Sequence, residues 1–196
     1  MRAQQREETR DQIVGAALTA LSELGFDGAS TRTIAELANV SQGLLTYHFK
    51  SKDELWQAAA NHLFALHDDW MDRATLKRGT VEPRVRQREF VRRLVHFHAR
   101  HPEFARFIAT YGRTDDARSK WLAETHLVRT YQRVADVLED TPAEDLPHAF
   151  YVLAGASGSL FSAGNECKLV TGVNPRSRAA VKRHADYLAN LLVPEE

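Results

Sequence analysis

Apolar residues recur every three or four positions along almost the whole chain of 196 residues. This spacing places apolar side chains along one face of an α-helix, whereas a half-buried strand would alternate apolar and polar residues. No stretch of the sequence alternates in that way strongly enough to indicate a strand. The chain is therefore predicted to be all-α, with about nine helices.

The first part of the chain contains two unusually short predicted helices with clear start and stop signals. One begins after Ser30, whose hydroxyl can cap free N–H groups, and ends at Asn39, a residue that tolerates a positive φ. The next is capped by Ser41. Ser51 and Glu54 have the spacing of a capping box, which predicts the start of a long helix that runs to about residue 74. Together these signals predict a helix-turn-helix unit followed by a long connecting helix.

The rest of the chain reads as a bundle of helices. A break is predicted over residues 75–83, where glycine and proline interrupt the pattern. The further predicted helices cover approximately residues 84–100, 103–111, 117–138, 148–170 and 176–192. We therefore expect two domains, an N-terminal helix-turn-helix DNA-binding domain over residues 1–55 and a C-terminal helical bundle over residues 56–196.

The chemistry of the helix-turn-helix unit suits a DNA duplex. In such a unit the second helix enters the major groove with its N-terminal residues at the base edges. Gln42 and Thr46 lie four residues apart on one helical face, and glutamine can pair with the edge of adenine. Gly43 lets the backbone approach the sugar-phosphate wall, and Lys52 adds a point charge. The first 55 residues carry six Lys and Arg against eight Asp and Glu, so that DNA affinity must depend on where a few charges lie. A capped helical corner with no partner is the alternative.

The segment TRTIAELANVSQGLLTYHFKSKDEL resembles the DNA-binding segment of the TetR family of bacterial transcriptional regulators. The shared features are Ile-Ala, Val-Ser-x-Gly, an aromatic run that ends in Phe49, and Ser-Lys-x-x-Leu. The sequence departs from the family at Thr33, which replaces an acid, and at Asn39, which replaces a glycine. It also has Thr46 where the family usually has tyrosine, with Tyr47 one residue later. Since one residue turns a side chain by about 100°, only one of these two can inherit the contact.

The resemblance implies which residues touch DNA. The predicted DNA-binding residues are Ser30, Thr31, Arg32, Thr33, Ser41, Gln42, Gly43, Thr46, Tyr47, His48 and Lys52. For Tyr47, packing beneath the first helix is the competing interpretation.

The resemblance also implies a small-molecule pocket and a dimer interface in the C-terminal bundle. Aromatic residues with a few polar partners suit such a pocket. The predicted ligand-binding residues are Trp70, Phe107, Tyr111, Trp121, His126, Tyr151, Phe161 and Asn165. The predicted dimer interface combines small residues near residue 156 with the apolar face of the last helix, namely Ala154, Ser157, Gly158, Val181, Tyr187, Leu188 and Leu191. Packing of these residues within one chain is the alternative.

Other patterns give weaker indications. His96, His98 and His101 invite a metal site, but residues two apart point to different sides of a helix, so scattered histidines are the favoured interpretation. The serine near residue 157 lacks the glycine spacing of a nucleophile elbow. A basic run is interpreted as a solvated helix face, with a second nucleic-acid surface as the alternative; it comprises Arg84, Arg86, Arg88, Arg92 and Arg93. No catalytic residue, cofactor or metal is predicted.

Location and function complete the prediction. Residues 146–165 lack charged side chains but contain proline, glycine and serine, which indicates a buried helix rather than a membrane span. The single cysteine, Cys167, and the polar N-terminus favour a cytoplasmic protein.

We expect a homodimeric, ligand-responsive repressor that a small molecule releases from its operator DNA. The alternatives are an all-helical metal-dependent protein or enzyme that uses His96, His98 and His101, and a helical adaptor that binds only protein.

Overall fold

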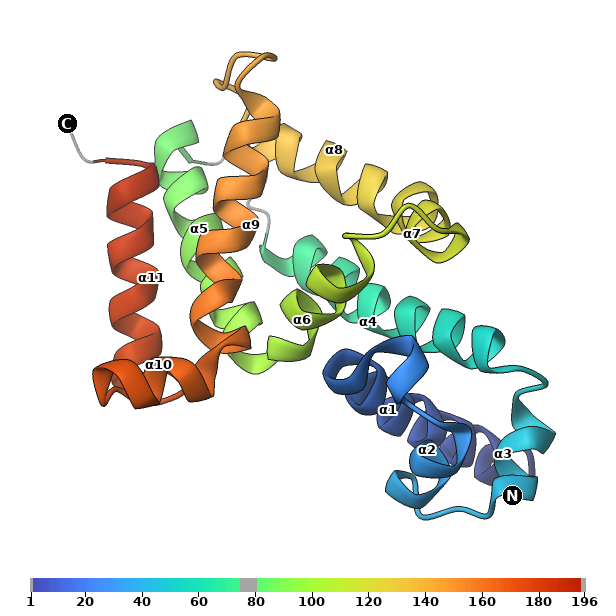
Figure 1. Ribbon diagram of the computed structural model, residues 1–196. Coiled ribbons are helices and arrows are strands. Elements are labelled where there is room, and N and C mark those ends of the chain that lie inside the picture. The colour runs from blue at the N-terminus through green and yellow to red at the C-terminus, as the bar shows by residue number, and fades with distance from the viewer. Residues whose placement is uncertain (1, 75–80, 195–196) are drawn as a thin grey trace.

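The computed structural model describes residues 2–74 and 81–194, and all regular elements within these ranges are helices. The all-α prediction is therefore confirmed (Figure 1). The predicted break at residues 75–83 lies largely outside the described residues. The elements in chain order are α1 (Arg2–Gly28), α2 (Thr31–Leu37), α3 (Gln42–His48), α4 (Lys52–Ala74), α5 (Pro83–Arg100), α6 (Pro102–Tyr111), α7 (Ala117–Leu122), a π-helical segment (Ala123–Leu127), α8 (Val128–Val137), α9 (Leu146–Ser162), α10 (Gly164–Thr171) and α11 (Arg178–Leu192).

Two hydrophobic clusters form the core of the described residues. The first gathers α1 to α4 with α6, α7 and Phe97 of α5, and it includes Ile34 and Leu45 of the helix-turn-helix together with Phe107. The second joins α5, α8, α9 and α11 with Met71 of α4. Trp70, near the end of α4, packs against both clusters. The first cluster also continues across the domain boundary predicted at residue 55, so the helix-turn-helix shares a core with α6.

The predicted helix ends are largely where the sequence places them. Gly25 has φ 71° near the end of α1, and Asn39 has φ 50° in the turn between α2 and α3. The predicted helix over residues 117–138 is one continuous run, but it contains the π-helical segment, which widens one turn of the helix. The predicted helix over residues 148–170 is instead broken at Ala163 into α9 and α10.

The small residues of α9 pack within the chain. Ser157 is fully buried, and its hydroxyl lies 3.0 Å from His98 Nδ1 and donates to the carbonyl oxygen of Leu153 at 2.6 Å. A Cβ atom added to Gly158 would lie only 2.9 Å from the Cβ atom of Ala105, so glycine allows α9 to cross α6 closely. Ser157 and Gly158, which were predicted to contact a second protomer, therefore pack within their own chain.

The prediction for the dimer interface must accordingly be corrected. Four of its residues are buried inside one chain and cannot meet a partner in this arrangement; they are Ser157, Gly158, Val181 and Leu188. The other three, Ala154, Tyr187 and Leu191, are exposed. Only these three remain available on the surface.

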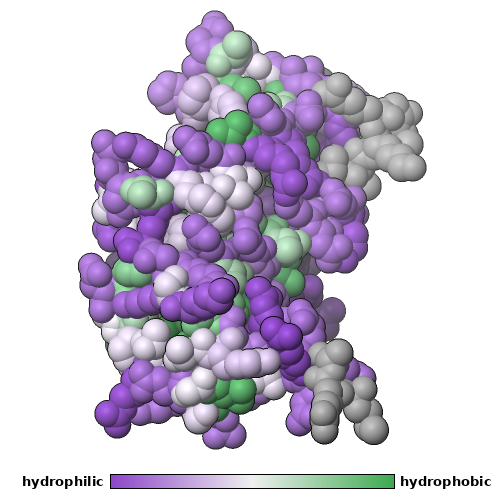
Figure 2. Space-filling model, turned by 90° about the vertical axis from the view of Figure 1, so that its right-hand side faces the viewer, coloured by the Kyte–Doolittle hydropathy of each residue, from purple (hydrophilic) through white to green (hydrophobic). Residues whose placement is uncertain are grey.

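The outer surface is polar on the face shown in Figure 2, where hydrophilic side chains dominate and hydrophobic ones appear in small separate spots. Among residues 2–74 and 81–194, no helix combines the length and the apolar character that crossing a bilayer requires.

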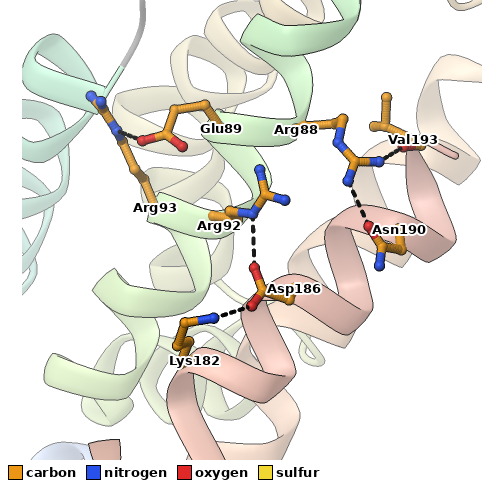
Figure 3. A network of polar contacts seen from close by, with 8 residues as sticks. All are labelled: Arg88, Glu89, Arg92, Arg93, Lys182, Asp186, Asn190 and Val193. Carbon is orange, nitrogen blue, oxygen red and sulfur yellow. Dashed lines mark hydrogen bonds and ion pairs between the residues drawn. The ribbon is translucent and has the colours of Figure 1, made fainter. Parts of the chain in front are cut away.

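Two arginines of α5 are buried. Arg86 is 3% exposed and pairs with Glu139, which follows α8. Arg88 is 7% exposed and donates to the carbonyl oxygen of Val193 at 2.5 Å and to Asn190 Oδ1 at 2.6 Å (Figure 3). The interpretation of this basic run as a solvated face is therefore wrong for these two residues.

The neighbouring arginines of α5 are also engaged within the chain. Arg92 pairs with Asp186 of α11 at 3.0 Å, and Lys182 reaches the same carboxylate at 2.8 Å (Figure 3). Arg93 pairs with Glu89 of its own helix at 2.6 Å. Arg88 and Arg92 thus fasten α5 to α11, and these charges are engaged within the fold rather than at a second nucleic-acid surface.

Candidate nucleic-acid interface

Serine caps fix the ends of α2 and α3. Ser30 Oγ accepts from the backbone N–H of Thr33 at 3.0 Å and lies 2.8 Å from Thr33 Oγ1. Ser41 Oγ accepts from the N–H of Leu44 at 3.1 Å. Thr33 thus contributes its hydroxyl to the cap of α2. The left-handed Asn39 sets the turn between the two helices without a glycine.

The side chains of α3 divide into an anchor and an outward face. Leu45 is 2% exposed and holds the helix in the first core cluster. Gln42, Gly43, Thr46 and Tyr47 are exposed. The face predicted to meet DNA is therefore open to solvent, as groove entry requires.

Thr46 and Tyr47 are both accessible but are differently engaged. Thr46 Oγ1 donates to the carbonyl oxygen of Gln42 at 2.9 Å, so its hydroxyl proton is already used. Tyr47 is 66% exposed, and its hydroxyl makes no hydrogen bond within the described ranges. The guanidinium carbon of Arg6 lies 5.5 Å from the centre of the Tyr47 ring. Tyr47 therefore does not pack beneath α1, and it keeps a free donor at the surface.

Two arginines of α1 join this face, and the sequence analysis did not identify them. Arg6 lies beside Tyr47, and the Arg10 guanidinium carbon lies 5.3 Å from the Phe49 ring centre. Burial and then the charges of Arg6 and Arg10 lower the pKa of His48 from its usual value. The available signal was that Arg6 and Arg10 are four residues apart and so share one face of a helix.

The start of α4 lies directly after α3, the helix that is predicted to enter the DNA groove. Glu54 N–H donates to Ser51 Oγ at 3.1 Å, and the Glu54 carboxylate accepts from the N–H of Lys50 at 2.8 Å. This confirms the predicted cap, with Lys50 rather than Ser51 as the return donor. Phe49 and Leu55 are buried and pin the corner. Lys52 is partly exposed and remains at the surface.

A contact from α7 reaches the same corner. Arg118 pairs with Asp53 at 2.9 Å, and its guanidinium carbon lies 3.4 Å from the Phe26 ring centre. The Lys52 ammonium lies 4.5 Å from the centre of the same ring. The aromatic ring of Phe26 therefore joins a residue of the C-terminal bundle to a predicted phosphate contact.

The predicted ligand-binding residues do not converge on one site. Five of them contribute to packed aromatic contacts in and around the first core cluster: Trp70, Phe107, Tyr111, Trp121 and His126. Tyr151 is 74% exposed on the outside of α9, which contradicts its predicted place in a pocket. Phe161 and Asn165 do lie together, in the lining of a cleft of about 300 Å³ beside α10.

The three histidines of the alternative metal site are not brought together. His96 is exposed, whereas His98 is buried against Ser157, and His101 Nδ1 lies 3.1 Å from the Glu103 carboxylate. In the described part of the chain, no group of three or more His, Cys, Asp or Glu side chains could hold a metal ion. The metal-dependent alternative has no support in this geometry.

Comparison with known proteins agrees with the N-terminal geometry. The family described as "Bacterial regulatory proteins, tetR family" matches residues 13–65. The chain is 34% identical over 110 residues to the HTH-type transcriptional repressor NicS of Pseudomonas putida, which covers 56% of this chain and 51% of that protein. It is also 34% identical over 89 residues to the regulator BetI of Paraburkholderia phymatum, which covers 44% of this chain and 43% of that protein. The chain thus spans about half the length of the curated relatives it matches.

Solved structures share the fold over nearly the whole chain. AibR, in complex with isovaleryl coenzyme A and operator DNA, aligns with a TM-score of 0.74 at 15% identity and covers 96% of this chain and 100% of its own. A TetR-like transcriptional regulator from Rhodococcus sp. RHA1 aligns with a TM-score of 0.68 at 22% identity, over 95% of this chain and 93% of its own. At these identities the likeness concerns the fold, and it extends through the C-terminal bundle.

Proposed function

Because the chain belongs to the TetR family of bacterial regulatory proteins, we propose that it is a ligand-responsive repressor of transcription that a small molecule releases from operator DNA. The observation that carries this proposal is the capped helix-turn-helix with an open, donor-rich face on α3. The name of NicS as a repressor and the complex of AibR with both a ligand and operator DNA support it. The protein would act in the bacterial cytoplasm, where operator DNA is found.

Within the interface, residues are assigned to two tasks. Gln42 and Thr46 face the base edges, where the glutamine amide can read adenine and the threonine methyl can contact thymine. Tyr47 is assigned to donate to a phosphate, and this choice over Thr46 is supported by the Thr46 hydroxyl, whose proton is occupied. The other predicted contacts position the protein on the backbone and carry little sequence information; they are Ser30, Thr31, Arg32, Thr33, Ser41, Gly43, His48 and Lys52, to which Arg6 is added.

A homodimer would present two such units to a near-palindromic operator. The apolar surface that supports it lies on α9 and α11, which are adjacent in the fold (Figure 1). Tyr151 is 74%, Val152 51%, Tyr187 64% and Leu191 60% exposed on these helices. Large apolar side chains gathered at a surface mark interaction sites. This proposal replaces the buried residues of the predicted interface with Tyr151 and Val152.

The link between effector and DNA is proposed to run through the start of α4. A ligand in the C-terminal bundle that displaces α7 would shift Arg118, and with it Asp53 and Phe26. The distance between the two helix-turn-helix units of the proposed dimer would then change. The effect on operator affinity can be no larger than the ligand's differential affinity for the two arrangements.

Two substitutions separate reading from positioning. Lys52→Ala is expected to weaken binding to operator and random duplex alike, and to reduce the slope of log affinity against log salt by about one. Gln42→Ala is expected to weaken operator binding by about 1–3 kcal/mol and to change random binding little. Titration of both duplexes at several salt concentrations, with DNA from upstream of the protein's own gene, measures both effects. Equal losses on the two duplexes for both variants would contradict this assignment.

Gly43→Ala tests whether the glycine serves the fold or the DNA. The position is open, because a Cβ atom added there would have only Ser41 Oγ nearby, at 4.0 Å, so the free protein can accommodate alanine. Alanine is the better helix former by about 1 kcal/mol, and the variant should be at least as stable as the parent in thermal unfolding. Operator affinity should fall, since the methyl group would lie between α3 and the sugar-phosphate wall. Undiminished operator affinity would remove Gly43 from the interface.

A further inference from the structure

Arg106, in the middle of α6, has no polar partner among the residues that the structure describes. Its side chain is partly buried, and its Nε atom is shielded from solvent without a hydrogen-bond acceptor. Across residues 2–74 and 81–194, the guanidinium takes part in no hydrogen bond or ion pair. A guanidinium cannot shed its proton, and withdrawing it from water without an acceptor costs free energy. Such a group is suited to an acceptor that is not part of the chain.

Arg106 lines the cleft of about 300 Å³ between α6, the end of α9, α10 and the turn that follows α10. Two more cations, Lys168 and Arg176, line the same cleft, and neither forms an ion pair in the described ranges. The only acidic side chain in the lining is Glu166. Three positive charges against one negative charge around a concave surface favour an anion.

Neutral groups of the lining complete a site for a small organic molecule. Asn174 Oδ1 accepts from the backbone N–H of Arg176 at 3.1 Å, which leaves the amide NH₂ group as a donor. Asn165 adds a second amide, and the buried Phe161 and Pro175 form the apolar floor of the cleft. A few polar groups around an apolar wall is the usual composition of a ligand pocket, and this volume lies at the small end of the common range.

A second cleft, of about 330 Å³, also has Arg106 in its lining, but its charge is different. It lies against α1 and α4, and Glu23 and Glu103 line it. Two carboxylates there oppose an anion, because like charges in a cleft repel it. The cleft beside α10 is therefore the favourable one.

We propose that the cleft beside α10 binds a small organic anion, whose carboxylate or phosphate oxygens pair with Arg106 and whose short apolar body lies against Phe161. Since α6 packs on both α9 and α7, occupation of the cleft bears on the helix that carries Arg118. The assignment of this anion as the effector rests on the proposed function. The proposal that the cleft binds an anion does not.

Binding is tested on the full chain with benzoate and phenyl phosphate, and with benzamide as the uncharged counterpart, at constant ionic strength. Calorimetry should show that at least one charged probe binds the parent protein and that benzamide does not. The stronger of the two charged probes identifies the anionic group. Arg106→Gln should weaken that probe at least tenfold, and Arg106→Lys, which keeps the charge, should weaken it less. Arg113→Gln removes an exposed arginine just beyond α6 and should leave binding unchanged.

Several results would overturn the proposal. Failure of both charged probes to bind the parent protein is one, and equal affinity in the parent and in Arg106→Gln is another. Without a probe, Arg106→Gln should unfold at the same or a higher temperature than the parent; a clear loss of thermal stability would show that Arg106 has a partner in the fold. If the bound probe leaves operator affinity unchanged, the effector assignment fails. A protein that binds the probe but no DNA would refute the proposed function alone.

Discussion

Lowering the pH from 7 to 4.5 is expected to reduce the free energy of unfolding by about 4 kcal/mol, because two buried histidines must remain neutral in the folded protein. Burial, the charge of His98 and those of two nearby arginines lower the pKa of His67 to about 3. Burial lowers the pKa of His98 to about 4, although its contact with Ser157 opposes the shift. Both side chains lie in the interior, at 3% and 4% exposure.

The direction follows from the protons bound in each state. The unfolded chain takes up a proton on each histidine near pH 6.5, whereas the folded chain does so only near pH 3 to 4. The stability from the neutral histidines is therefore fully present above pH 6.5 and is lost progressively as the pH falls below it. Each histidine contributes about 2 kcal/mol over this interval. Burial also lowers the pKa of His126, which acts in the same direction.

Urea unfolding at pH 7 and at pH 4.5 measures this loss. His67→Phe should reduce the loss by about half, because phenylalanine fits among the rings of Phe64, Phe97 and Phe104 and cannot be protonated. This substitution also removes a buried Nδ1 atom that has no hydrogen-bond partner among the described residues. His96→Gln, at an exposed position of the same region, is the matched control and should leave the loss unchanged. Equal losses in the parent and in His67→Phe would contradict the prediction.

Replacement of Arg88 by methionine is expected to lower the free energy of unfolding by about 3 kcal/mol, because two hydrogen bonds from a charged donor, each worth about 1.5–3 kcal/mol, would be lost. Methionine keeps much of the apolar length of the side chain, so the loss would come chiefly from polar contacts. The carbonyl oxygen of Val193 and Asn190 Oδ1 would lose their donor at the C-terminal end of α11. Urea unfolding at neutral pH measures the change.

The same substitution one turn along α5 is the control. Arg92 is 33% exposed and pairs with Asp186, which is 41% exposed. Exposed pairs of this kind are worth less than about 1 kcal/mol, since water screens them. Arg92→Met should therefore have a small effect. Similar losses for the two variants would show that burial does not distinguish these arginines.

Local signals explain why the helix-turn-helix could be predicted from the sequence. The caps at Ser30, Ser41 and Ser51 and the left-handed Asn39 depend on residues within four positions of one another. Such interactions are encoded in short stretches, and the outward face of α3 follows from the helical period once Leu45 is the inward anchor. Even here Arg6 was missed, because its nearness to Tyr47 depends on the way α1 crosses α3.

The remaining errors concern partners that are distant in sequence. Arg88 meets residues more than one hundred positions away, and His98 meets Ser157 across 59 positions. Composition alone makes an arginine-rich helix look solvated and a small-residue helix look like an interface between chains. The ligand prediction rested on an ambiguous signal for a related reason, since aromatic residues suit a packed core as well as they suit a pocket. Of the predicted ligand-binding residues, only Phe161 and Asn165 lie in the same cleft. Arg106 lines this cleft too, but the sequence around it shows no pattern that indicates a binding residue.

The shared position of Trp70 has a mechanical consequence. Its indole packs against both core clusters, near the C-terminal end of α4, the helix that follows the helix-turn-helix. Each cluster is densely packed and so resists internal deformation. A rotation of one cluster against the other would change the contacts of this indole, and the fluorescence of Trp70, once separated from that of Trp56 and Trp121, would report that rotation.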